Sequence, residues 1–267
     1  MLIAIVNQSN LNQPNQSNYL VSNADVATMT QAIASQIQSD VAPIWGRAAA
    51  TVTFYTDSTV VPSDAYVVAI VDNIPAQQTG VVGSHTETQA GQMSGMVAAQ
   101  PILANNGQVL TGDLLTADWS VSSTLSHEVL EMFIDPNCNM WVNDGQGSVY
   151  SLEVCDPVEA PTYTVNVGSQ EVPVLVSNFV TPAWFDPQAP SGAQFDKLSS
   201  PELTAPFSIL SGGYMTYETK SGKLQQQFGT DYPAWRQAMK SSPQQQPQAL
   251  ETRGQRRLVQ LGASYHS

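Results

Sequence analysis

Residues 124–136 of this chain have the sequence Thr124-Leu125-Ser126-His127-Glu128-Val129-Leu130-Glu131-Met132-Phe133-Ile134-Asp135-Pro136. The stretch is mostly apolar and a proline follows it, which predicts a helix over about Ser122–Ile134 that Pro136 ends. His127 and Glu131 are four residues apart, so on a helix they share one face, roughly 5–6 Å apart at Cβ. The predictions for the rest of the chain start from this helix.

Two side chains at that spacing can hold one divalent metal ion, and the carboxylate of Glu128 can reach a water beside it. Downstream, Glu153 is predicted to be the third ligand, and Asp156 is predicted to orient His127 from behind. We therefore predict a metal centre made by His127, Glu131 and Glu153, with Glu128 as the general base. The alternative is that these residues form only a solvated or hydrogen-bonded polar helix face.

The ion itself is predicted to be zinc, the usual partner of such a helix. However, the helix has Glu131 where the general motif has a second histidine. Two carboxylates neutralise the charge of the ion, which makes Mn²⁺ or Ca²⁺ an alternative and a structural role a competing prediction.

Four further residues are candidates for the site. His85 lies in a predicted loop and is placed near the metal centre, the alternative being a solvated loop histidine. Tyr214 is predicted to donate a hydrogen bond to an oxyanion, or else only to begin a strand. Cys138 and Cys155 leave three alternatives open: one disulfide, zinc ligands beside His127, or two free buried thiols.

A resemblance strengthens the metal prediction. The pattern Ser126-His127-Glu128-x-x-Glu131-x-x-x-Asp135-Pro136, followed by Trp141 and Glu153-x-x-Asp156, resembles a group of largely uncharacterised bacterial zincin-like proteins. A similar string occurs in plant phosphate-induced, EXORDIUM-like proteins. The resemblance to the bacterial group extends into 177–185 and 212–215, and so covers most of residues 1–220. It implies a zincin-like fold with a metal site at His127, Glu131 and Glu153, and it supplies no substrate.

The remaining pattern predicts an α+β protein. Apolar residues that recur every three or four positions indicate a helix over about 24–45, capped by Ser22 or Asn23. Pro101 makes the run Met96–Leu103 an edge strand, after a loop over Asn73–Thr86. The other predicted strands are 2–6, Thr51–Thr56, Ala65–Val71, Ser148–Val154, Tyr163–Val167, Val172–Val176 and Tyr214–Glu218.

Three parts are predicted along the chain. Residues 1–136 form a zincin-like subdomain with a mixed sheet, a backing helix and the active-site helix. Residues 137–240 form a loop- and strand-rich C-terminal subdomain that completes the site. Residues 241–267 form a basic tail rich in Gln and Pro.

Composition excludes several classes of protein. The 267 residues are 42% hydrophobic and 12% charged with a net charge of −13, so a buried core is expected and wholesale disorder is not. Residues 1–196 hold one basic residue, Arg47, against eighteen acidic ones, and this body would repel nucleic acid. No apolar run reaches the roughly 18–20 residues of a membrane span. Without an export signal, the cytoplasm is the expected compartment.

We therefore predict a metal-dependent, metallopeptidase-like hydrolase whose peptide or protein substrate adds to the Met96–Leu103 edge. The alternative is a non-catalytic structural or virion-associated protein on a degenerate zincin scaffold. In that alternative the basic tail binds an acidic neighbour or another copy of the chain. A third alternative, a carbohydrate or cell-surface binding module, depends on the plant resemblance and on Trp141 and Trp184.

Overall fold

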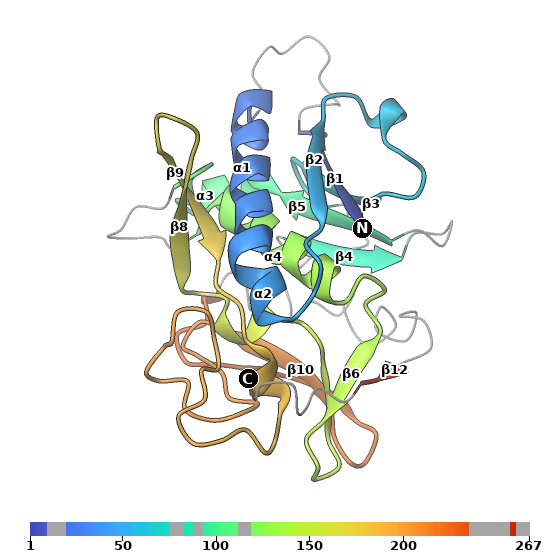
Figure 1. Ribbon diagram of the computed structural model, residues 1–267, viewed down its shortest axis with the longest axis vertical. Helices are drawn as coiled ribbons and strands as arrows, with labels where there is room; N and C mark the ends of the chain where they lie inside the picture. The colour runs from blue at the N-terminus through green and yellow to red at the C-terminus, as the bar shows by residue number, and fades with distance from the viewer. Residues whose placement is uncertain (10–19, 75–82, 88–92, 112–118, 235–256, 260–267) are drawn as a thin grey trace.

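The computed structural model shows a protein of mixed α and β structure, with a largely parallel sheet, two main helices and a strand-rich C-terminal part (Figure 1). It describes residues 1–9, 20–74, 83–87, 93–111, 119–234 and 257–259. Among the described helices, none combines the length and apolar character that crossing a bilayer requires.

The first sheet has the strand order β2-β1-β3-β5-β4. Its strands are β1 (Leu2–Asn7), β2 (Thr51–Tyr55), β3 (Tyr66–Val71), β4 (Gly83–Glu87) and β5 (Met93–Ala98). Strands β2, β1, β3 and β5 are parallel, and β4 is antiparallel to β5. The continuous apolar run of β1 is buried, as is typical of a parallel strand covered on both faces.

Two long helices contact this sheet and each other. Helix α1 (Asn23–Gln36) contacts β1 and β2 and continues through a π-helical turn (Ile37–Val41) into α2 (Ala42–Ile44). Helix α4 (Val121–Ile134) contacts β3, β4 and β5, and α1 also contacts α4. The predicted helix over 24–45 is confirmed, and Ser22 is its N-cap.

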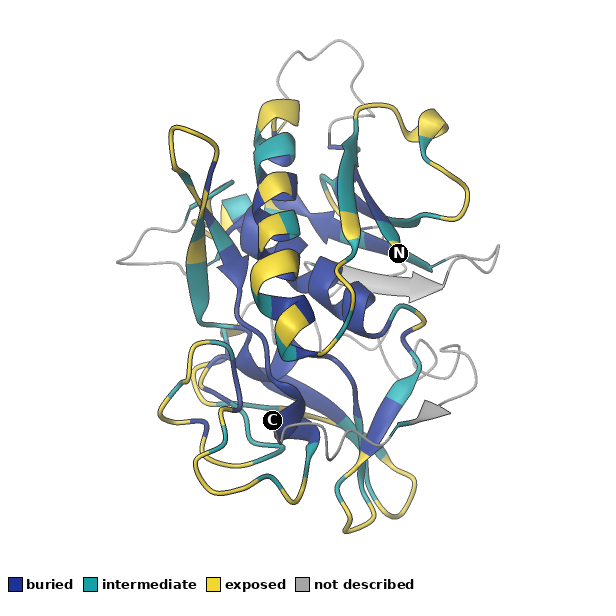
Figure 2. Ribbon diagram, viewed as in Figure 1, coloured by how far each residue is buried: buried dark blue, intermediate teal, exposed yellow. Residues whose placement is uncertain are grey.

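Helix α4 is buried along its whole length, whereas α1 exposes one side to solvent (Figure 2). At the start of α4, the Oγ of Ser120 accepts a hydrogen bond from the backbone N–H of Ser123 at 2.9 Å. His127, Glu128 and Glu131 are buried with the rest of the helix. The solvated form of the polar-face alternative is therefore wrong, and the hydrogen-bonded form stays a prediction.

The C-terminal part consists of a hairpin and a second sheet. The hairpin strands β8 (Thr162–Val167) and β9 (Val172–Ser177) contact α1, and β9 also packs along α4. The second sheet has the order β11-β10-β7-β6-β12. Its strands are β6 (Met140–Asn143), β7 (Val149–Ser151), β10 (Tyr214–Glu218), β11 (Leu224–Phe228) and β12 (Arg257–Leu258).

The predicted edge strand Met96–Leu103 is wrong in two respects. Strand β5 ends at Ala98, and Ala99–Ala104 form helix α3. Pro101 lies in the first turn of α3, where backbone N–H groups have no intrahelical acceptor and a proline is tolerated. Strand β5 also lies inside the sheet, between β3 and β4, so β4 ends the strand order instead.

Other boundaries differ less. The predicted loop over Asn73–Thr86 is wrong at its end, because residues 83–86 belong to strand β4. Strand β7 covers only the middle of the predicted Ser148–Val154 run. Strands β6 and β11 were not predicted, since both are short and carry polar residues.

Two hydrophobic clusters hold the described parts together, and the smaller one packs Ala32 of α1 against Val167, Val174 and Val176 of the hairpin. The larger one forms the main core. It includes Ile5 of β1, Leu130 of α4, Val154 after β7 and Met215 of β10. Most of the predicted tail, 241–267, lies outside the described residues; its described part, 257–259, pairs with β6 of the same chain. The predicted divisions at 136 and 240 stay predictions.

Candidate metal centre

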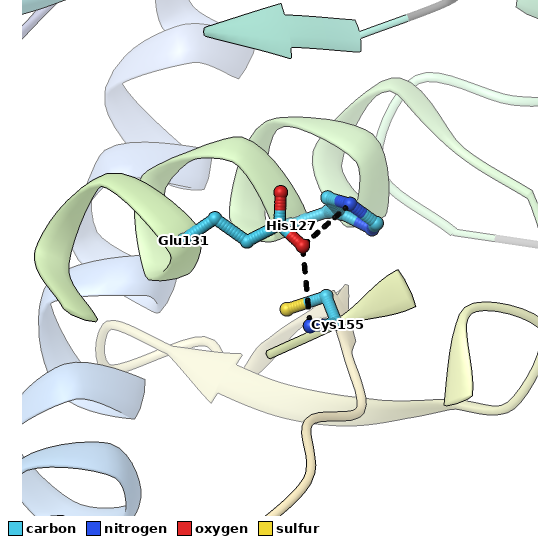
Figure 3. A group of neighbouring side chains, drawn as sticks. All are labelled: His127, Glu131 and Cys155. Carbon is cyan, nitrogen blue, oxygen red and sulfur yellow. Dashed lines mark hydrogen bonds and ion pairs between the residues drawn. The ribbon is translucent and has the colours of Figure 1, made fainter. Parts of the chain in front are cut away.

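A buried cluster of potential metal ligands lies between α4 and the turn that follows β7. Nε2 of His127 is 3.2 Å from Oε1 of Glu131 and 3.1 Å from Oδ1 of Asp156. The backbone N–H of Cys155 donates to the same Glu131 oxygen at 3.2 Å (Figure 3). Helix α4 thus supplies two side chains at helical spacing, and the turn brings Cys155 and Asp156 against them.

The donor atoms of three residues lie close enough to share one ion. One ring nitrogen of His127, one carboxylate oxygen of Glu131 and Sγ of Cys155 are all within 4.8 Å of one another. The exposed fractions of these residues are 7%, 3% and 0%. Nitrogen, oxygen and sulfur donors in one small cluster are the set that zinc binds in proteins. The residues therefore fit a divalent metal ion.

Burial and mutual charge shift the pKa values of this cluster. Burial alone would lower the pKa of His127, but the charge of Glu131 and contacts with Asp156 and Glu131 raise it well above its usual value. Burial, together with the charges of Asp156 and Glu153, raises the pKa of Glu131 to about 8 against the lowering effect of His127. Concentrated negative charge in a buried place is an arrangement that a bound cation stabilises.

Asp156 begins the 3-10 turn Asp156–Val158. It does not contact His127 from the side of the ring that the sequence predicts. A carboxylate that orients a ligating histidine from behind contacts the ring nitrogen that faces away from the metal. Asp156 instead contacts Nε2, the nitrogen that also contacts Glu131. The structure thus places Asp156 on the same side of the ring as the ligand cluster.

Glu153, the predicted third ligand, is buried near the cluster, and its charge raises the pKa of Glu131. Among the described residues, the ligand atoms that group with His127 and Glu131 include Sγ of Cys155 and none of Glu153. The role of Glu153 as a ligand stays a prediction.

Glu128, the predicted general base, points toward strand β4. A Cβ atom on Gly83 would overlap Oε1 of Glu128 and would lie 2.9 Å from its Cγ. The backbone of β4 can therefore lie this close to the carboxylate only because residue 83 has no side chain. The charge of Glu128 also raises the pKa of His127, so the carboxylate lies near the cluster as well as under β4.

Tyr214 borders the cluster from strand β10. Burial raises the pKa of its phenol well above the usual value, and the charges of Asp156 and Glu159 add to the shift, so the hydroxyl keeps its proton. Gly213 makes the approach of the strand possible, because a Cβ there would overlap the carbonyl oxygen of Pro157 and lie 3.0 Å from that of Asp156. Tyr214 also contacts the ring of Tyr232, with centroids 5.8 Å apart.

The sequence interpretation missed Glu159 as a site residue. It is buried at the end of the Asp156–Val158 turn, and its charge acts on Tyr214. The spacing from Asp156 to Glu159 is that of one helical turn, a signal that could have placed both carboxylates on one side of the turn.

The other candidates lie as follows. His85 belongs to strand β4, paired with Gly95 of β5, rather than to a loop; its side chain is outside the described part. Cys138 and Cys155 are both free and buried, so the disulfide alternative is wrong, and Cys138 is not in the ligand group.

Trp141 and Trp184, on which the carbohydrate-binding alternative partly depends, are each only 1% exposed, and Nε1 of Trp184 donates to the carbonyl of Ser208 at 2.8 Å. These two tryptophans are therefore core residues and offer no exposed ring to a ligand. The alternative, which also depends on the plant resemblance, stays a prediction.

No protein-family model, curated protein or solved structure matches the chain. The resemblance to bacterial zincin-like proteins therefore stays a prediction.

Proposed function

We propose that the chain is a zincin-like, metal-dependent hydrolase that cleaves amide bonds in extended peptides. The observation that carries the proposal is the buried pair of His127 and Glu131, with Nε2 3.2 Å from Oε1, while Sγ of Cys155 lies within 4.8 Å of both donor atoms. The first two residues are those that the sequence motif predicts as ligands, and the third comes from the segment predicted to complete the site.

The arrangement of α4 and β4 supports this proposal. Strand β4 is antiparallel to β5 and ends the strand order of the sheet, as far as the described residues go. It contacts α4, and Gly83 lies against the carboxylate of Glu128. An extended peptide that pairs with the outer side of β4 would run past the motif helix. Strand β4 thus replaces Met96–Leu103 as the proposed docking edge.

In the proposed reaction, a bound divalent cation would act as a Lewis acid. Glu128 takes a proton from the attacking water and delivers it to the nitrogen of the leaving amine. Tyr214, whose phenol stays protonated, donates a hydrogen bond to the oxygen of the scissile carbonyl as negative charge develops there. His127 and Glu131 would hold the ion, with Asp156 beside them on the same side of the His127 ring.

The test compares Glu128→Gln with Glu131→Gln, using metal content and hydrolysis of a denatured protein substrate as readouts. Glu128→Gln should keep the metal content of the wild type and lose about 10²–10⁴-fold in rate, the usual contribution of a general base. Glu131→Gln should lose metal and activity together. Wild-type turnover by Glu128→Gln would contradict the mechanism.

A non-catalytic role is the second candidate, and the burial of the ligands favours it. Cys155 is fully buried, and Glu131 and His127 nearly so, as in structural metal sites that leave no open position. In this case chelation lowers the melting temperature, and no substrate is hydrolysed. For the assembly form of this candidate, deletion of 241–267 removes β12 and should disrupt oligomerisation while the rest of the fold stays intact, which light scattering and circular dichroism measure.

A further inference from the structure

Cys155 joins the ligand group of His127 and Glu131, and the inference drawn from it rests on the proposed metal site. The zincin-like resemblance implies three ligands without sulfur: His127, Glu131 and Glu153. The structure instead brings Sγ of Cys155 within 4.8 Å of the His127 and Glu131 donor atoms. This difference changes the chemistry of the site.

The position of Cys155 is held from two sides. Its backbone N–H donates to Oε1 of Glu131 at 3.2 Å, which fixes the residue against helix α4. Burial raises the pKa of its thiol well above the usual value, and the side chain of Ser177, the last residue of β9, acts on the thiol in the lowering direction. Ser177 is in turn fixed to α4, because its backbone N–H donates to Oγ of Ser126 at 3.1 Å. Helix α4 and the end of strand β9 therefore hold the sulfur beside the Glu131 carboxylate (Figure 3).

We propose that Sγ of Cys155 binds the metal ion together with His127 and Glu131, which makes the centre selective for thiophilic ions such as Zn²⁺. Thiolate ligands favour zinc and disfavour Mn²⁺, Ca²⁺ and Mg²⁺, which prefer oxygen donors. On binding, the thiol proton leaves to solvent and the sulfur–metal bond forms. A set with one histidine and two carboxylates would not discriminate in this way.

The experiment uses the full chain and cobalt(II) as a spectroscopic probe. A thiolate bound to cobalt gives a near-ultraviolet charge-transfer band, whereas imidazole and carboxylate ligands do not. The chain has two cysteines, so Cys138→Ser leaves Cys155 as the sole thiol and is the matched control. We expect the band in the wild type and in Cys138→Ser, and its loss in Cys155→Ser and in His127→Ala.

Zinc affinity is the second readout. Cys155→Ser should weaken zinc binding by at least the roughly 10- to 100-fold that losing an outer-shell partner costs, and should weaken manganese binding much less. Circular dichroism checks that this variant folds. If it does not, the Cys138→Ser spectrum still decides the question, because it needs no change at Cys155.

The outcomes separate this inference from the proposed function. One equivalent of cobalt that depends on His127 but gives no thiolate band in Cys138→Ser overturns the role of Cys155 and leaves the hydrolase proposal standing. A thiolate band in a protein without hydrolytic activity supports Cys155 and contradicts the hydrolase. If the protein shows no metal binding that depends on His127, both the role of Cys155 and the hydrolase proposal are overturned.

Discussion

Glu131 has the most unusual environment of the cluster residues. Its carboxylate contacts His127 and the backbone of Cys155 and is surrounded by the charges of Asp156 and Glu153. Burial and these charges raise its pKa to about 8, so at neutral pH the metal-free protein holds a proton that the unfolded chain has released. Metal binding must displace this proton.

The metal-free protein should therefore become less stable as the pH rises from about 5 to 8. A carboxyl group with a raised pKa in the folded state contributes stability below its unfolded pKa, and this contribution is lost as the pH rises through the folded value. The raised pKa of His127 acts in the same direction from its unfolded value of 6.5 upward. Each proton changes the free energy of unfolding by about 1.4 kcal/mol per pH unit.

Urea unfolding at several pH values measures this effect, with Glu131→Gln as the control whose pH dependence should be flatter. Saturating zinc should oppose the trend, because zinc binds the deprotonated ligands more tightly as the pH rises. Equal pH dependence in the metal-free wild type and in Glu131→Gln would contradict the assigned pKa of Glu131.

Gly83 is a second residue whose identity the site requires. A side chain at this position overlaps the buried carboxylate of Glu128, so Gly83→Ala should displace Glu128 and destabilise the fold by about 1–3 kcal/mol. The variant should keep its metal and lose hydrolytic rate. In a Glu128→Ala background the same substitution should cost much less, and a double-mutant cycle in urea measures this coupling. Additive costs would show that the two residues do not interact.

At the scale of elements, the long and strongly patterned segments were predictable. The 24–45 helix and the α4 helix follow from periodicity, a capping serine and the stop at Pro136, all of which are local signals. The Met96–Leu103 prediction failed because a proline is tolerated both on an edge strand and in the first turn of a helix. The local sequence fits both structures and does not distinguish between them. The edge position of β4 depends on strand order, which no local pattern reports.

Helix α4 is held in place by polar contacts as well as by apolar packing. Oγ of Ser126 donates to Oε1 of Gln36 in α1 at 2.7 Å and accepts from the backbone N–H of Ser177 at 3.1 Å. All three residues are buried. This serine therefore ties α4 to both α1 and the hairpin, one residue before His127.

Ser126→Ala should lower the free energy of unfolding by roughly 1–3 kcal/mol, because it removes the hydrogen-bond partner of two buried polar atoms. Thr28→Ala is the matched control: Oγ1 of Thr28 donates to the carbonyl of Ala24 at 2.9 Å in an exposed place. Its removal should change the stability by no more than about 0.5 kcal/mol. Urea denaturation compares the two, and equal costs would show that the Ser126 contacts do not stabilise α4.

At the scale of the whole molecule, the class of fold was predictable and the composition of the site was only partly so. Helical spacing places His127 and Glu131 together in any structure that makes α4 a helix. The choice between Glu153 and Cys155 depends on the path of the turn after β7. The close approaches at Gly83 and Gly213 depend on how separate elements pack, and spacing in the sequence does not contain that information.

Several acidic residues of the chain are buried at or near the candidate metal centre. Glu128, Glu131, Glu153, Asp156 and Glu159 are all buried, so five of the acidic residues lie inside the protein, at or near the candidate metal centre. Burying charged groups is costly unless they are compensated. A tightly bound divalent cation would provide compensation at the point where α4 meets the turn after β7.

Elemental analysis of the purified full chain, compared with His127→Ala, shows whether His127 and its neighbours bind a metal ion. We expect about one equivalent of zinc per wild-type chain and its loss in a folded His127→Ala variant. Zinc-free wild-type protein that takes up no stoichiometric metal after dialysis against zinc would show that these residues do not form a metal site.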